Sequence, residues 1–422
     1  MYALPEVRKC AAGGWLLITC ILIGACADPV LTGLRTWPPH VKFPIPTAGG
    51  CAGHPGVNLT QVAGAVSCIG LVDSQLVFPR GVATLGDDVL VVDKGSDLAS
   101  RFERKGSIYR YRSATDLKTR DTLLTGLYNP SGIAVWQSRY VFISTPNQVL
   151  RVDPHVTPVD VAVAIDKIPT PGWHYLTAIY IHQNWLYLTV PSATDHCESG
   201  QADEPQVQYP CGEQETAVLR RYRINDQGQV SADFEFVARG LRDALAMVAH
   251  TDQPLLYAAD NGWDHVYLSN TEYDPAHTPH DEVNVINMEA ATAEHFGWPY
   301  CFDATKITPP YADQVADCQA FTAPALLLPP HAAPLGMAWV DGALWLNLHG
   351  YRAGGQQTVR VGVDKQGAVN NAFETMILWD YRPHNGYGIG RPFGITALNN
   401  DTLLITDDWN GALLQVVLNP DR

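Results

Sequence analysis

Short stretches in which apolar and polar residues alternate recur along most of the chain, as in half-buried β-strands. Long stretches with the period of an amphipathic helix are hard to find. The recurring unit has one order: a turn of small residues, an apolar strand, a polar turn and a second strand. Six such units begin at Pro79, Asn129, Tyr175, Arg242, Ala333 and Arg391.

Most of these units continue into a third strand, for example QVLRVD after the second unit and ALLQVV after the last. Repetition of such units is typical of a β-propeller, in which each unit forms one blade. A β-sandwich also contains many short strands, but it would not restart six times with the same phrase. We therefore predict an all-β, six-bladed β-propeller in which the strand after Arg391 closes the ring. The irregular spacing places insertions in the loops, where binding sites are common.

The N-terminus has the pattern of a secretory signal, with Arg8 and Lys9 followed by about fifteen apolar residues. This apolar run is shorter than the roughly 20 residues of a membrane span. The residues before Cys26 resemble a bacterial lipobox, so we expect a signal peptide over 1–25 and a lipid on Cys26. A proline-rich tether over 26–50 would then join this anchor to a propeller domain over 51–422. We expect the protein to be located in the bacterial cell envelope, where it faces the periplasm or the exterior and contacts the membrane through its lipid only.

The cysteines that follow the lipobox fall into three pairs of near neighbours. Several pairings are compatible with six cysteines, but the local one is the simplest for an oxidising compartment. It predicts three disulfides: Cys51–Cys68, Cys197–Cys211 and Cys301–Cys318.

The composition of the chain limits the classes of molecule that it can bind. A net charge of −15 disfavours nucleic acid and anionic membrane surfaces. Any site for an anionic ligand must therefore be built locally from a few arginines. With 46% apolar residues, the chain can bury a large core.

The second half of the chain contains, in order, LYAADNGWD, HFGWPYC, LNLHGY and GRPFGIT. This ordered set resembles the glucose/sorbosone dehydrogenase family, soluble quinoproteins whose six-bladed propeller holds pyrroloquinoline quinone (PQQ) and Ca²⁺. The resemblance is strong from about Tyr175 to the C-terminus and limited to the blade pattern over 79–154. It implies a dehydrogenase that oxidises a sugar or sugar aldehyde and passes electrons to a quinone or a cytochrome.

The resemblance assigns a metal site to LYAADNGWD. In that family the turn after the strand supplies backbone carbonyls to Ca²⁺, which implies Gly262 and Trp263 at the metal, with Asp260 and Asn261 beside it. Calcium prefers about six to eight oxygen ligands, which a carbonyl-rich turn flanked by acids can offer. An ordinary Asp-Asn-Gly turn is the alternative explanation of these residues.

The resemblance also implies the catalytic groups. His174 matches the catalytic histidine, a base suited to taking a hydroxyl proton near neutral pH. Arg242 matches an arginine beside the quinone, where it would serve both catalysis and cofactor binding. Arginine is the natural clamp for carboxylates, although each arginine has a surface or interblade salt bridge as its alternative role. Four further residues are expected at the cofactor: Arg391, Arg352, Trp263 and His349.

Three departures from the family keep other functions open. Asp243 stands where asparagine is usual, and Trp263 stands where arginine is common. The arginine that usually follows the catalytic histidine is replaced by Leu176 to Ala178. The alternatives are a non-catalytic propeller that binds a sugar or a protein, and a calcium-dependent hydrolase or lactonase. Three or more inward arginines or lysines would favour the quinone, a ring of acids and asparagines the hydrolase, and exposed aromatic residues alone a binding protein.

Overall fold

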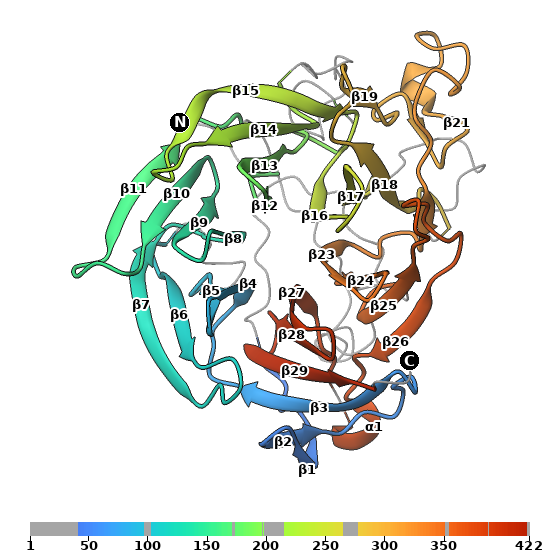
Figure 1. The fold of residues 1–422 in the computed structure, drawn as a ribbon. Coiled ribbons are helices and arrows are strands. Elements are labelled where there is room, and N and C mark those ends of the chain that lie inside the picture. Colours follow the sequence, from blue (N-terminus) through green and yellow to red (C-terminus); the bar gives the residue numbers. More distant parts are fainter. Residues whose placement is uncertain are drawn as a thin grey trace, which may run out of the picture.

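The computed structural model describes residues 41–96, 103–170, 174–195, 197, 215–264, 277–350, 354–386 and 388–419. Six sheets stand around a central axis like the blades of a propeller (Figure 1), which confirms the predicted fold class. Helix is scarce in this part of the chain: α1 (Arg382–Asn385) and a 3₁₀ turn at Pro309–Tyr311. No helix of the described residues is long and apolar enough to cross a membrane.

The four main strands of each blade are antiparallel, and the first of them lies at the centre of the ring. The first blade contains β4 (Pro79–Leu85), β5 (Asp88–Asp93), β6 (Gly106–Arg112) and β7 (Thr119–Leu127). The second contains β8 (Ile133–Trp136), β9 (Tyr140–Thr145), β10 (Gln148–Asp153) and β11 (Asp160–Ile165). The third contains β12 (Ile179–His182), β13 (Trp185–Val190), β14 (Val218–Ile224) and β15 (Val230–Arg239), with β19 (Glu294–His295) at its edge.

The other three blades follow the same plan. The fourth contains β16 (Ala244–Ala249), β17 (Leu255–Asp260), β18 (Asp281–Asn287) and β22 (Leu326–Leu328). The fifth contains β23 (Pro334–Val340), β24 (Ala343–Leu348), β25 (Gln357–Gly362) and β26 (Glu374–Leu378). The sixth contains β27 (Pro392–Asn399), β28 (Thr402–Asp407), β29 (Ala412–Leu418) and β3 (Val66–Asp73). A hairpin of β20 (Cys301–Phe302) and β21 (Lys306–Ile307) belongs to an insertion.

All six predicted units supply the two inner strands of a blade. The second strand of each blade is packed between its neighbours on both faces, so it reads as a nearly continuous apolar run rather than an alternating one. In β24, for example, all six residues of ALWLNL are buried. This packing joins adjacent blades into one core, in which Trp345 and Trp379 are among the largest buried side chains.

The ring closes between the two ends of the chain. β29 pairs with β3, and Val416 lies opposite Ile69 in this antiparallel ladder. The blade that begins after Arg391 therefore closes the ring, but it does so by adding β3, a strand from before the first unit, to β29 rather than through the strand after Arg391. Closure in this way removes two exposed strand edges.

Two predicted disulfides are present. Cys51–Cys68 joins β1 (Thr47–Cys51) to β3, and Cys301–Cys318 closes the insertion that carries β20. Cys197 is also disulfide-bonded, but its expected partner Cys211 lies outside the described residues, as do the signal segment and Cys26.

The end of the expected tether lies against the propeller. The backbone N–H of Phe43 donates to Oδ1 of Asn410 at 2.9 Å, and Nδ2 of Asn385 donates to the carbonyl of Pro44 at 2.9 Å. β1 then begins at Thr47 and pairs with β2 (His54–Val57). Contact with the body thus starts before the expected boundary at residue 50.

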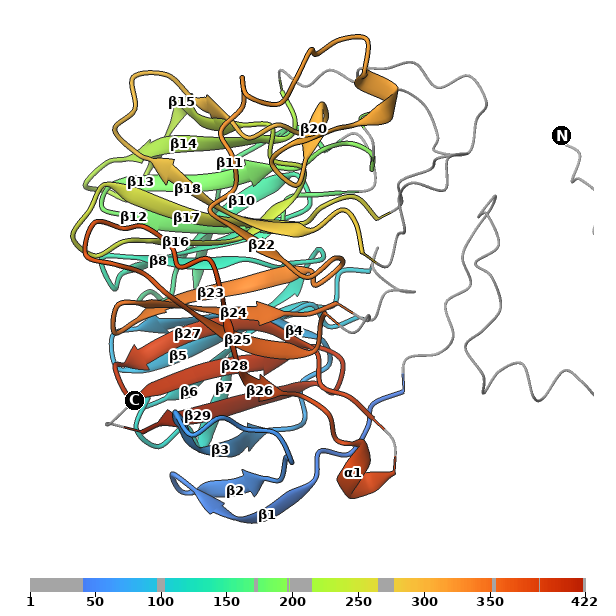
Figure 2. The ribbon, with the colours of Figure 1, turned by 90° about the vertical axis from the view of Figure 1, so that its right-hand side faces the viewer.

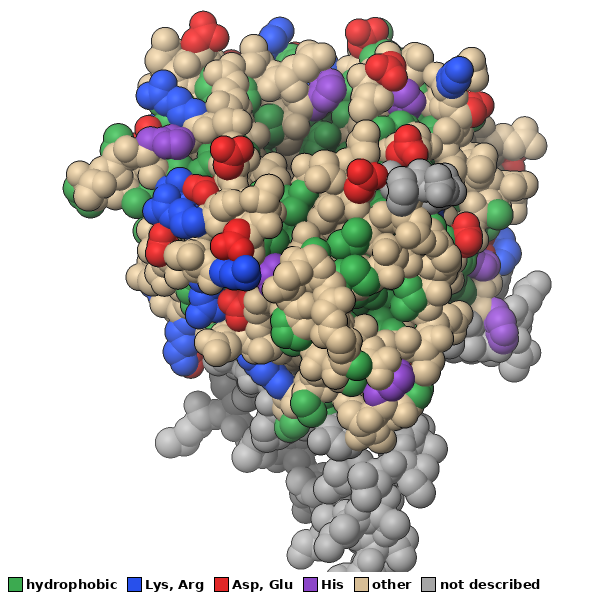
Figure 3. Space-filling view, turned by 60° about the horizontal axis from the view of Figure 1, so that its bottom comes forward, with side chains coloured by type: hydrophobic (Ala, Val, Ile, Leu, Met, Phe, Trp, Pro, Cys, Tyr) green, Lys and Arg blue, Asp and Glu red, His purple; other side chains and the backbone are tan. Residues whose placement is uncertain are grey.

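The described insertion with β20 and the helix α1 lie on the same side of the disc (Figure 2). On this side each inner strand begins and each second strand ends, and we call it the mouth face. On the face drawn in Figure 3, basic side chains lie among acidic ones rather than in one continuous patch.

Candidate functional site

The topology brings the expected site residues to the mouth face. His174, Arg242 and Arg391 each precede an inner strand, whereas Asp260 ends a second strand and His349 follows one. Because strand starts and strand ends of this kind meet on the same side of every blade, residues far apart in sequence converge there. Arg352 lies outside the described residues.

Asp260 binds the backbone just before the inner strand of its own blade. Its carboxylate accepts hydrogen bonds from the backbone N–H groups of Arg242 at 2.8 Å and Asp243 at 2.6 Å. Burial raises the pKa of Asp260 to about 7, although these two N–H donors oppose the shift. The aspartate in LYAADNGWD therefore has a structural role in fixing Arg242.

The same arrangement recurs in two other blades. Asp93, at the end of β5, accepts from the N–H groups of Val77 at 2.7 Å and Phe78 at 2.9 Å. Asp407, at the end of β28, accepts from the N–H of Arg391 at 3.1 Å. The shared aspartate in VVDKG, AADNG and ITDDW is the sequence signal that could have revealed this repeat.

The ring of His174 is held in one tautomer. Its Nδ1 atom is 2.9 Å from the carbonyl oxygen of Ser192, which can only accept, so Nδ1 carries the proton. Its Nε2 atom is 3.3 Å from Nη2 of Arg242, which can only donate. The imidazole is thus neutral, and the lone pair of Nε2 points to the arginine.

Arg242 is 2% exposed and lies at the centre of a charged network. Its Nη2 donates to Oδ1 of Asp195 at 2.6 Å, and its Nη1 donates to the carbonyl of Asn261 at 3.2 Å. Burial alone would lower the pKa of Arg242, but the carboxylates around it, Asp195 foremost, outweigh burial and raise it. The guanidinium therefore stays charged and fixed in orientation.

Asp195 was missed by sequence reasoning. It follows the third blade's second strand in PSATDH and is 3% exposed. Besides Arg242, its Oδ1 accepts from the backbone N–H of Asp264 at 2.9 Å. It therefore holds Arg242 and the turn after β17 together, and no motif or spacing in the sequence marks it.

A second network of a histidine, an arginine and an aspartate lies between the fifth, sixth and first blades. Nε2 of His349 is 2.9 Å from Oδ2 of Asp408, and its Nδ1 is 2.8 Å from Nη2 of Arg391. His349 thus carries its proton on Nε2 and accepts from the arginine at Nδ1. Burial, reinforced by Arg391, lowers the pKa of His349 to about 4. Arg80 completes the network with a 2.9 Å bond from Nη1 to Asp408.

The mouth face contains several cationic side chains with little exposure. Arg242 and Arg391 are 2% and 5% exposed, and Lys94, which follows Asp93, is 1% exposed. With Arg80, at least four cations start inner strands or end second strands on this face. These cations of the mouth face could bind the carboxylates of a ligand.

The turn after β17 offers oxygen atoms rather than a cluster of metal-binding side chains. Among the described residues, no three His, Cys, Asp or Glu side chains come together as a metal site. However, Oδ1 of Asn261 and Oδ1 of Asp243 are buried without a hydrogen-bond partner among these residues. Buried oxygens without donors are unfavourable unless a cation or water satisfies them, so this turn fits a hard cation such as Ca²⁺.

Contacts with neighbouring segments fix the positions of Gly262 and Trp263 in this turn. The N–H of Gly262 donates to Oδ1 of Asp281 at 2.7 Å. The indole of Trp263 is 2% exposed, in an apolar cluster that includes Trp298 and Tyr311. The ring thus packs within this cluster, and the expected place of Trp263 at the cofactor stays a prediction.

Beneath the turn lies a cavity of about 20 Å³. Its lining includes the carboxyl groups of Asp260 and Glu282. Burial raises the pKa of Glu282 well above its usual range, and the nearby carboxylate of Asp260 adds to this shift. The cavity has room for about one water molecule.

A family model described as TrAA12-like matches residues 68–419. Among solved structures, the holo form of the pyranose dehydrogenase PQQ domain from Coprinopsis cinerea is 17% identical with a TM-score of 0.66, covering 87% of this chain and 99% of that chain. The calcium structure of the Trichoderma reesei AA12 enzyme is 15% identical with a TM-score of 0.67, covering 90% of this chain and 99% of that one.

Bacterial proteins are similar as well. The PQQ-bound form of aldose sugar dehydrogenase from Streptomyces coelicolor is 16% identical with a TM-score of 0.57, covering 85% of this chain and 100% of that chain. An uncharacterized protein of Borreliella burgdorferi is 22% identical over 355 residues, covering 80% of this chain and 85% of that protein. These findings confirm the predicted resemblance to quinoprotein sugar dehydrogenases.

Proposed function

Because the chain belongs to the TrAA12-like family, we propose that it is a PQQ- and calcium-dependent dehydrogenase that oxidises a sugar or a sugar aldehyde. One observation carries the proposal above the others. A neutral histidine, His174, and a buried cation, Arg242, share a hydrogen bond beside the turn that follows β17.

Within this proposal His174 is the general base. The substrate hydroxyl replaces Nη2 of Arg242 as the hydrogen-bond partner of Nε2, which then takes the hydroxyl proton. The carbonyl of Ser192 keeps the Nδ1–H in place and stabilises the imidazolium that forms. Arg242 lies where its Nη2 can donate to the oxygen that loses the proton. Asp195 is a positioning residue, since it fixes the guanidinium through the 2.6 Å bond.

The quinone, when bound, supplies the acceptor for the two electrons that leave the substrate carbon. The proposed holders of its carboxylates are Arg242 and Arg391, with Arg80 nearby in the second network. The cations of the mouth face support this assignment, and two of the similar structures are described as a PQQ domain and a PQQ-bound form.

The proposed calcium ligands are the carbonyl groups of Gly262 and Trp263, with Asn261 and Asp260 beside them. The unsatisfied Oδ1 atoms of Asn261 and Asp243 support a cation at this turn. The similarity to the calcium structure of the Trichoderma reesei AA12 enzyme is a further support.

The proposal extends to the location of the enzyme. The signal-like segment 1–25 and the lipobox before Cys26 support a lipid-anchored protein in the bacterial cell envelope, facing the periplasm or the exterior. Its electron acceptor would be a quinone or a cytochrome of that compartment. Mass spectrometry of the mature protein tests the anchor, and an unmodified N-terminus at another residue would contradict it.

Reconstitution tests the activity. Apo-protein supplied with PQQ and Ca²⁺ should reduce an artificial electron acceptor with an aldose, and omission of either component should abolish the reaction. Sugar binding without oxidation would favour the non-catalytic alternative. Hydrolysis of a lactone without PQQ would favour the hydrolase.

A further inference from the structure

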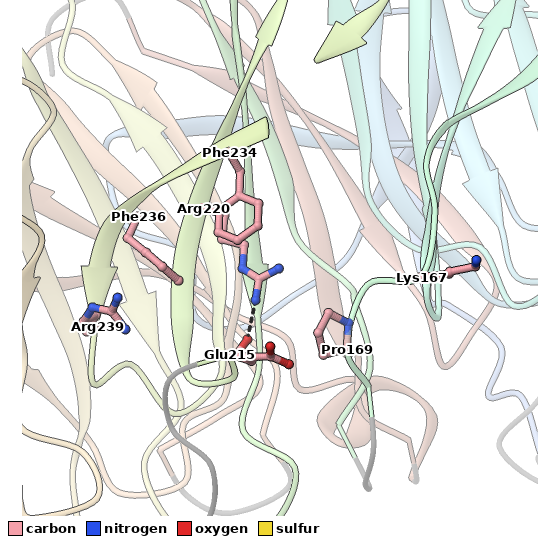
Figure 4. Close-up of a pocket in the computed structure, with 7 residues that line it drawn as sticks. All are labelled: Lys167, Pro169, Glu215, Arg220, Phe234, Phe236 and Arg239. Atoms are coloured by element: carbon pink, nitrogen blue, oxygen red, sulfur yellow. Dashed lines mark hydrogen bonds between the residues drawn. The ribbon is translucent and has the colours of Figure 1, made fainter. Parts of the chain in front are cut away.

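A large groove lies between the second and third blades, away from the residues discussed so far. Its volume is about 780 Å³, which is within the range of pockets for organic ligands rather than single ions. Figure 4 shows Lys167 and Pro169, which follow β11, opposite side chains of β14 and β15. The described lining consists of Lys167, Pro169, Glu215, Arg220, Phe234, Phe236 and Arg239.

Phenylalanine rings position the two arginines of this groove. The guanidinium carbon of Arg220 lies 4.2 Å from the ring centre of Phe234, and that of Arg239 lies 3.8 Å from the ring centre of Phe236. The two rings pack edge to face at 5.2 Å. Such cation–π contacts occupy the faces of the guanidinium groups and leave their N–H edges for hydrogen bonds.

These edges lack an acidic partner among the described residues. Arg220 is 5% exposed, and it donates from Nη2 to the carbonyl of Glu215 at 2.8 Å, but its buried Nε has no hydrogen-bond partner there. The guanidinium of Arg239 forms neither a hydrogen bond nor an ion pair in that part of the chain. Arg221, by contrast, is bonded to Glu235 at 2.7 Å. A buried N–H without an acceptor is unfavourable, so the groove is built for a ligand that accepts hydrogen bonds.

The charge of the lining is unusual for this protein. The groove carries three basic side chains and one acidic one, Glu215, although the whole chain has a net charge of −15. Carboxylate and phosphate groups match the forked N–H edge of arginine.

Residues of both walls of the groove are close in sequence to residues of the candidate site. Lys167 and Pro169 precede His174 on one side, and Arg239 precedes Arg242 on the other. Pro169 and His174 are five residues apart in the sequence, and five residues span at most about 18 Å when extended. A ligand of a few sugar rings can therefore reach from the groove toward His174.

We propose that this groove binds an acidic saccharide, with Arg220 and Arg239 on one wall holding a carboxylate or phosphate and Lys167 on the other wall contacting a further oxygen of the ligand. The oxyanion chemistry follows from the groove alone, whereas the saccharide rests on the proposed function. The substrate class is then an acidic sugar or oligosaccharide rather than a neutral one.

Calorimetric titration of the cofactor-free protein at low ionic strength tests this site with trigalacturonate, glucose 6-phosphate and neutral maltotriose. We expect an acidic saccharide to bind and maltotriose not to bind. Binding should weaken roughly tenfold or more in Arg239→Gln and in Lys167→Gln, because each loses a charge-assisted contact. Arg223→Gln is the matched control: it lies on β14 and stacks on Trp185 at 4.2 Å, but it is not part of the lining.

Binding of trigalacturonate alone would identify a carboxylate as the anchored group, and binding of glucose 6-phosphate alone would identify a phosphate. Equal binding of maltotriose, absence of binding up to about 10 mM, or unchanged binding in both groove variants would overturn the proposal. Because the titration needs no cofactor, failure of the dehydrogenase proposal would not by itself prevent binding. Failure of binding would leave turnover of a neutral aldose unaffected.

Discussion

Nε2 of His174 lies 3.3 Å from Nη2 of Arg242, although the two residues start the inner strands of different blades. The contact joins a neutral base to a permanent cation. Each partner is fixed from behind, the histidine by the carbonyl of Ser192 and the arginine by Asp195. This preorganisation makes specific mutations informative.

His174→Gln should lower turnover by roughly 10²–10⁴-fold, because glutamine keeps a hydrogen-bonding group but cannot take a proton at neutral pH. Quinone affinity and the melting temperature should change little. Steady-state kinetics of the reconstituted enzyme measures the effect, with the exposed His155→Gln as control. Turnover equal to that of the wild type would remove His174 from the mechanism.

Asp195→Asn should destabilise the fold by about 3–5 kcal/mol, since it leaves the buried Arg242 without its main counter-charge. The two side chains are 3% and 4% exposed, so solvent screens their interaction little. Asp160→Asn is the control, because Asp160 is 56% exposed in its 3.5 Å pair with Arg151 and should cost less than about 1 kcal/mol. Urea unfolding compares the two, and equal losses would contradict the central role of Asp195.

His349 should make stability depend on pH below neutrality. Its folded pKa of about 4 lies below the unfolded value of 6.5, so the unfolded state binds the proton more tightly. The contribution is complete above about pH 6.5 and is lost as the pH falls towards 4, by at most about 1.4 kcal/mol per pH unit. The charged groups that face the ring are Asp408, Arg391 and Arg80.

Urea unfolding between pH 4 and 7 checks this dependence. His349→Gln should be less stable than the wild type at pH 7, and this difference should shrink as the pH falls. A difference that stays constant over the range would show that His349 does not titrate as described.

The disulfide Cys301–Cys318 should contribute about 3 kcal/mol, because it constrains a short loop of the unfolded chain. The double variant Cys301→Ser, Cys318→Ser should therefore lower the free energy of unfolding by this amount. The matching variant of Cys51 and Cys68 opens a loop of the same sequence separation, 17 residues, and should lose a similar amount. Loss of less than about 1 kcal/mol in both would indicate that the bridges act only locally.

The blades could be predicted from sequence because their signal is local. The repeated start is visible at Pro79, Arg242 and Arg391 alike, and each second strand shows the apolar run of a doubly covered strand. The count of six units predicts a closed ring, but no motif identifies β3 as the strand that closes it. The positions of His174, Arg242 and Asp260 on one face then follow from the topology.

The partners of these residues could not be predicted. Asp195 and Asp408 act through contacts across blades, over 47 and 59 residues of sequence, and Ser192 acts within its own blade, over 18 residues. Insertions of irregular length separate Asp195 from Arg242 and Asp408 from His349, so no spacing encodes these two pairs. For Trp263 the motif indicates the residue but not the apolar cluster with Trp298 and Tyr311 in which its ring packs.

The most direct test of the proposed function is calorimetric titration of PQQ into the protein loaded with Ca²⁺. We predict saturable binding of one quinone per chain, weakened at least tenfold in Arg242→Ala and in Arg391→Gln, because each removes a clamp for a carboxylate. His174→Gln should bind as the wild type does. Absence of binding at tens of micromolar PQQ, or binding that neither arginine variant weakens, would contradict the assignment of this mouth to the quinone.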